Sequence, residues 1–79
     1  MTRSELSEAI ALLEKGDWRA AHGIVQKDEG SALACWAHGI VHLMEGDAAN
    51  ARSWYRRAKR PFRRDIPAEI AALSECLKR

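Results

Sequence analysis

The stretch GDWRAAHGIV (residues 16–25) decides the fold, because it recurs 30 residues later as GDAANARSWY (residues 46–55). Each copy opens with Gly-Asp, a pair in which Gly ends one helix and Asp caps the next. Ala21 and Val25 in the first copy, and Ala51 and Tyr55 in the second, then fall at helical spacing. An internal period of this length indicates a helical-repeat architecture.

Reading outward from these two copies, the same signals predict five helices in one all-α domain covering residues 1–79. Thr2 and Glu5 have the spacing of a capping box, and Pro61 is expected to end the fourth helix. No segment alternates with a period of two, so no sheet is expected. The prediction is two antiparallel helical hairpins plus a C-terminal capping helix: hairpin 1 over about 3–27 (helices to about 15 and 27), hairpin 2 over about 31–60 (helices 32–45 and 48–60), and the capping helix over about 65–78.

The second repeat carries a spaced set of residues, Cys35-x2-His38-Gly39-x2-His42, then Ala51-x3-Tyr55, then Ala58. This set resembles the tetratricopeptide repeat family, whose pattern is W-x2-L-G-x2-Y, then A-x3-F, then P. The glycine, the alanines and the aromatic residue match that pattern, whereas its Trp, Leu and Tyr are replaced. Residues 50–58 are similar to the second helix of the related Sel1-like repeats. The chain is also similar to a group of short bacterial proteins of unassigned function that share an H-x3-H-x2-E-G-D…N-A…W-Y-R-R-A signature.

The resemblance implies a scaffold that binds a protein or peptide partner along one face of each first helix. Carried over by position, that face is formed by Leu33, Trp36, Ile40, Leu43 and Met44. The alternative is that these residues pack as core. Two repeats are fewer than the usual three, so a second copy could cover the face. The sequence therefore predicts a TPR-like, non-enzymatic protein-interaction module that forms a homo-oligomer, in the simplest case a dimer.

A first alternative function is metal binding. His38 and His42 lie four residues apart on one helix and can share an ion, and Glu45 could add a ligand. One straight helix cannot close a tetrahedral site, so His22 is the natural addition from another helix. The competing interpretation is that these histidines pack between helices and bond to a carboxylate or a carbonyl. No cofactor other than a divalent metal is suggested.

A second alternative is an anionic partner. The basic segment includes Arg52, Arg56, Arg57, Arg60, Arg63 and Arg64, with Trp54, Tyr55 and Phe62 between them. Such residues can contact phosphates and stack on bases. The competing interpretation is that these basic residues form a solvated face and stabilise the C-terminus of their helix. Because this interpretation is favoured, nucleic acid is not the expected partner.

Composition and charge limit the classes of protein to which this chain could belong. Hydrophobic residues make up 47% and charged residues 30%, as in a folded domain. Residues 1–30 carry a net charge of −2 and residues 31–79 a net charge of +4. No signal peptide, membrane span or disulfide spacing is present, so a cytoplasmic location with both thiols reduced is expected. No catalytic motif is recognised, and no enzyme activity is expected.

Overall fold

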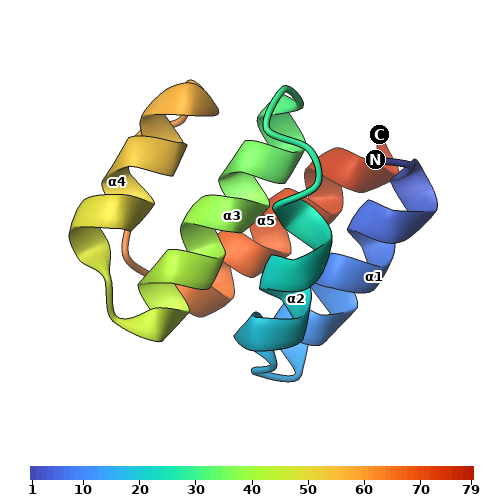
Figure 1. Cartoon of the computed structure of the whole chain (residues 1–79), viewed down its shortest axis with the longest axis horizontal. Coiled ribbons are helices and arrows are strands. Elements are labelled where there is room, and N and C mark those ends of the chain that lie inside the picture. The colour runs from blue at the N-terminus through green and yellow to red at the C-terminus, as the bar shows by residue number, and fades with distance from the viewer.

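The computed structural model describes residues 1–79 and contains five α-helices and no strand (Figure 1). This confirms the all-α class. None of the helices is both long enough and apolar enough to cross a bilayer. The helices are α1 (Arg3–Glu14), α2 (Trp18–Val25), α3 (Ala32–Glu45), α4 (Ala48–Arg57) and α5 (Ile66–Lys78).

Each helix begins with a side chain that accepts a hydrogen bond from a backbone N–H three residues later. Such caps satisfy amide groups that have no partner inside the helix. At α1 the side chains of Thr2 and Glu5 form the reciprocal capping box that the sequence predicts. The other four caps are Asp17, Ser31, Asp47 and Asp65.

Two helices end in glycines whose backbone is left-handed. Gly16 after α1 has a φ of 86°, and Gly46 after α3 has a φ of 91°, values that a residue with a Cβ adopts only at a cost. The repeated Gly-Asp pair therefore turns the chain as predicted. The first helix ends at Glu14 rather than residue 15, and the second at Val25 rather than residue 27.

The fourth helix ends earlier than Pro61 predicts. α4 stops at Arg57, whereas the expected end was Arg60, because Lys59 adopts a left-handed φ of 59°. The backbone N–H of Arg60 then donates to the carbonyl oxygen of Tyr55 over 3.1 Å, which closes the helix with a Schellman-type turn. A lysine that adopts the left-handed conformation cannot be recognised from the sequence. The prediction that the fourth helix continues to Arg60 and is ended by Pro61 was therefore wrong.

Helix α3 lies at the centre and contacts all four other helices. α2 and α4 flank it, and α5 crosses behind it in Figure 1. α5 also packs on α1, and the Arg3 side chain donates to the carbonyl oxygen of Leu77, which joins the two ends of the chain. The helix with the most continuous apolar sequence is therefore the one with neighbours on every side.

The open apolar groove expected on the third helix is not present, because α5 packs on α3. Trp36 and Ile40 are 1% and 0% exposed and belong to the core. Leu33, Leu43 and Met44 are partly buried and pack against that core. Both residues are buried, so the packing alternative describes them correctly.

A buried carboxylate ties α5 to α3 and α4. The indole N–H of Trp36 donates to Glu69 Oε1 over 3.2 Å, and the hydroxyl of Tyr55 donates to the same oxygen over 2.7 Å. Burial and the neighbouring Glu69 carboxylate raise the pKa of Tyr55 well above its usual range, so its hydroxyl remains a donor. One oxygen thus connects three helices.

Replacing Glu69 with Ala should lower the free energy of unfolding by about 3 kcal/mol, because two buried donors lose their acceptor. Urea unfolding of Glu69→Ala measures this loss. Glu75→Ala is the matched control, since Glu75 is an exposed glutamate on the same helix. An equal effect of the two substitutions would contradict the role given to the Glu69 carboxylate.

Gly39 is the point of closest approach between α3 and α4. A Cβ built at this residue would lie 2.5 Å from Cδ1 of Tyr55 and 3.4 Å from the carbonyl oxygen of Ala51. Neither neighbour can move easily, because the Tyr55 ring is buried and the oxygen belongs to the backbone. A side chain here would separate the two helices.

Gly39→Ala should therefore lower the free energy of unfolding by about 1–3 kcal/mol through overpacking. Gly23→Ala is the matched control, since a Cβ on this helical glycine meets nothing within 4 Å. That variant should gain up to about 1 kcal/mol from helix propensity. Opposite signs in thermal unfolding support the close approach, and a gain in both variants would contradict it.

Candidate metal centre

The three histidines of the chain come together between α2 and α3. His22 projects from α2, and His38 and His42 project from successive turns of α3. The ring centroids lie 4.9 Å apart for His22 and His38, 5.5 Å for His22 and His42, and 4.9 Å for His38 and His42. Each histidine has one ring nitrogen that lies within 4.8 Å of a ring nitrogen in each of the other two. The structure thus places His22 beside the His38–His42 pair.

One nitrogen of the cluster has no partner. His38 is only 4% exposed, and its Nδ1 atom is buried without a hydrogen bond. A buried ring nitrogen without a partner costs free energy, so this arrangement requires an explanation. Burial, followed by the neighbouring His42 and His22, lowers the pKa of His38 to about 4. At neutral pH the ring is therefore uncharged, and one of its nitrogens carries a lone pair that can bind a metal ion or accept a hydrogen bond.

Glu45 orients the second buried histidine. Its Oε1 atom lies 2.9 Å from Nδ1 of His42, which fixes the ring and leaves Nε2 free for another partner. His42, Glu45 and Asp47 form a second group of possible metal ligands within 4.8 Å of one another, but both carboxylates are exposed and neither belongs to the three-histidine set. Glu45 can therefore either orient His42 from behind or act as a ligand itself, as the sequence suggested.

Trp54 forms one wall of the cluster, a role that the sequence did not indicate. Its ring stacks on His38 with centroids 3.7 Å apart and an angle of 9° between the planes. The guanidinium of Arg57 lies 4.7 Å from the centre of the Trp54 ring. No spacing links residues 38 and 54 in the sequence, because only the packing of α3 on α4 brings them together.

Cys35, which precedes His38 by three residues on α3, lies outside the cluster. Its thiol donates to the carbonyl oxygen of Glu29 over 3.3 Å. Burial raises the pKa of this thiol, which keeps it protonated and unreactive. The other cysteine, Cys76, lies on α5.

The candidate residues for an anionic partner divide into two groups. Arg57 forms an ion pair with Glu29 at 3.5 Å and lies against Trp54, on the side of the histidines. The others are exposed on and after α4, and none of them forms an ion pair: Arg52, Arg56, Arg60, Arg63 and Arg64.

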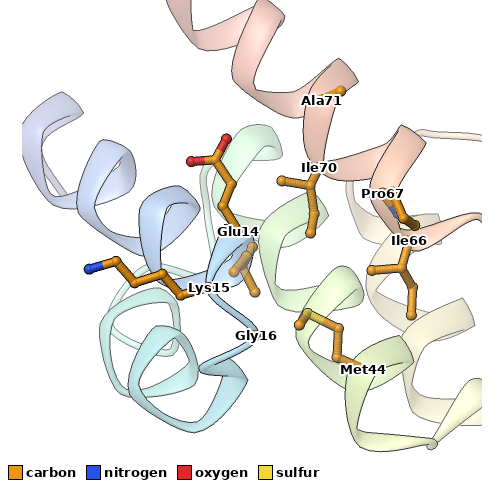
Figure 2. Close-up of a pocket in the computed structure, with 9 residues that line it drawn as sticks. Glu14, Lys15, Gly16, Met44, Ile66, Pro67, Ile70 and Ala71 are labelled. Carbon is orange, nitrogen blue, oxygen red and sulfur yellow. The ribbon is translucent and has the colours of Figure 1, made fainter.

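None of the three cavities of the molecule is lined by a histidine. An apolar cleft of about 470 Å³ lies between the end of α1, the end of α3 and the start of α5. Figure 2 shows Met44, Ile66 and Ile70 pointing into it, so Met44 is the expected groove residue that faces open space. The histidine cluster therefore has no substrate-sized cavity beside it.

Protonation of His38 should destabilise the fold in mild acid. The unfolded chain has an ordinary histidine pKa near 6.5, whereas the folded pKa is about 4, so the unfolded state binds more protons between these values. Stability is full above about pH 6.5 and falls as the pH drops through this window. The expected loss from pH 7 to pH 5 is about 2 kcal/mol.

Urea unfolding in the presence of a chelator, repeated at both pH values, measures this loss. His38→Phe retains an aromatic ring against Trp54 and should remove most of the pH dependence. If wild type and variant respond equally to pH, the burial of a neutral His38 is not its source.

Comparison with protein-family models, with curated proteins and with solved structures found no match to this chain.

Proposed function

We propose that this chain is a small metal-binding protein that holds one divalent transition-metal ion between α2 and α3. His22, His38 and His42 are the ligands. The observation that carries the proposal is that three imidazoles converge, each with one ring nitrogen within 4.8 Å of one in each of the other two. The Nδ1 atom of His38, which is buried without a hydrogen-bond partner, supports it.

Packing alone accounts poorly for this cluster. A histidine that serves only as core normally hydrogen-bonds through its buried nitrogens. His42 does so through Glu45, but His38 does not. Three close imidazoles also repel one another if more than one is charged, whereas a coordinated ion draws them together. A cation bound at His38 would replace the missing hydrogen bond.

The donor set favours zinc or a neighbouring ion. Imidazole ligands suit zinc, copper and nickel, and three histidines with one open position are a known zinc arrangement. Two nitrogens on a tetrahedral zinc ion lie roughly 3.3 Å apart, given Zn–N bonds of about 2.0–2.1 Å. The rings need to close from separations of up to 4.8 Å, which small side-chain rotations allow. Half-buried His22 gives the ion a route from solvent.

The absence of a cavity beside the histidines favours binding over catalysis. An ion held at this place joins α2 to α3, and its binding free energy adds to the stability of the fold. This role suits a chain of 79 residues, because so small a domain has a thin stability margin.

We also propose that the helices that carry the site form a tetratricopeptide-like array. The order in which α1, α2, α3 and α4 pack one on the next supports this interpretation, and α5 closes the array (Figure 1). The interaction function that the resemblance implies has less support, since α5 fills the expected groove.

Zinc should raise the melting temperature of the metal-free protein. At a free concentration 100 times the Kd, binding adds about 2.7 kcal/mol, which corresponds to roughly 10 °C or more for a domain of this size. His22→Gln should abolish the shift, and because His22 is half-buried the variant should still fold. Native mass spectrometry should show one ion per chain.

Glu45→Gln tests the positioning of His42 and should weaken zinc binding roughly tenfold to hundredfold. Glu8→Gln, an exposed glutamate on α1, is the matched control and should bind as wild type does. Isothermal titration calorimetry measures both. No heat and no thermal shift with zinc, copper or nickel would overturn the proposal.

A further inference from the structure

The segment that follows the middle of α4 forms a second distinctive region, independent of the histidines. Between residues 52 and 64 the chain has no acidic residue. We define the basic face as the six exposed cationic residues of this segment other than Arg57: Arg52, Arg56, Lys59, Arg60, Arg63 and Arg64.

The fold gathers these residues onto one end of the molecule. Arg52 and Arg56 are one helical turn apart, about 6 Å along the axis of α4. The chain after α4 runs back along that helix (Figure 1), and the guanidinium of Arg52 lies 4.4 Å from the centre of the Phe62 ring. This contact brings the segment that contains Arg63 and Arg64 back alongside α4, and Arg60 and Arg63 line one small cavity.

The charges of the basic face are only partly balanced within the chain. The guanidinium of Arg60 lies 3.7 Å from the centre of the Trp36 ring, and Arg60 and Arg63 line a small cavity together with Glu69. None of its six residues forms an ion pair, whereas the neighbouring Arg57 pairs with Glu29. Dipole stabilisation at the end of α4 explains Arg56, but it does not extend to the loop residues Arg63 and Arg64, which lie beyond the last turn. Binding of a polyanion would neutralise this dense array of positive charges.

The aromatic residues of this region are not free to stack on bases. Trp54 has His38 on one face and the guanidinium of Arg57 near its ring. Phe62 contacts Arg52 and the edge of Tyr55. Trp36 is 1% exposed. The stacking contribution that the sequence suggested is therefore unavailable, and recognition of single strands, which depends on it, is disfavoured.

The basic face lacks the features that two other anionic partners use. A peptide needs pockets for its side chains, but the cavity at this face, beside Arg60 and Arg63, measures only about 90 Å³. The larger apolar cleft is lined by no arginine. A membrane surface favours an inserted apolar side chain, and the only large exposed apolar residue is Met1, at the other end of the fold.

We infer that the basic face binds the phosphate backbone of double-stranded nucleic acid without reading its bases. Arginine is suited to this contact, because its planar guanidinium can donate two parallel hydrogen bonds to one phosphate. The inference goes beyond the proposed metal site and does not depend on it.

Fluorescence anisotropy with a labelled 20-base-pair DNA duplex tests this inference, in a chelator so that the metal site has no influence. Four phosphate contacts predict a slope of about −3.6 for log K against log salt, or roughly a hundredfold loss of affinity between 50 and 200 mM salt. The double variant Arg52→Gln/Arg56→Gln should make the slope shallower by about two.

The matched control is the double variant Arg19→Gln/Lys27→Gln, which removes two exposed positive charges at α2 and the loop after it. It should retain wild-type affinity for the duplex. An equal loss in both double variants would show a general effect of net charge and would overturn the inference. Tighter binding to a single strand of equal length, to polyglutamate or to anionic phospholipid vesicles would also overturn it. Circular dichroism confirms that each variant is folded.

Discussion

Helix α4 can lie against α3 at its observed distance because residue 39 has no side chain. The Tyr55 ring occupies the space in which a Cβ would stand, and the carbonyl oxygen of Ala51 lies just beyond it. Close packing of this kind leaves no room for adjustment, since protein interiors are nearly as dense as organic crystals. The position of α4 then decides where its two aromatic residues go, and these residues build both the core and the candidate site.

Trp54 and Tyr55 are adjacent in the sequence and serve two different regions. Tyr55 enters the core, where its hydroxyl and the indole of Trp36 share one oxygen of Glu69 and hold α5 in place. Trp54 points to the neighbouring side and stacks on His38. The pairing of α3 with α4 therefore fixes the fold and the wall of the histidine cluster together, so that the geometry of the cluster depends on the rigidity of the core.

The sequence predicted what depends on neighbours along the chain. The five helices, their N-caps, the two Gly-Asp turns and the i, i+4 histidine pair all follow from local spacing. The features that it missed depend on contacts between distant segments or on backbone strain. Lys59 adopts a left-handed conformation that its residue type disfavours, so the end of α4 was placed too late. Trp36 was assigned to an open groove because nothing local shows that α5 covers it. Trp54 was considered as a stacking residue of the basic segment, because nothing local shows that it packs on His38 of α3.

The surroundings of His38 bear directly on what the cluster can bind. Burial and the neighbouring imidazoles keep a second proton off this ring at neutral pH, so its other nitrogen carries a lone pair and an incoming metal ion has no proton to displace there. A proton would sit on a single ring and would carry the whole cost of placing a charge in this buried position. A metal ion instead shares its charge among three nitrogens that are already close, with Glu45 behind one of them. The same packing that makes His38 a poor base therefore keeps its ring neutral, which is the form of imidazole that the proposed metal site requires.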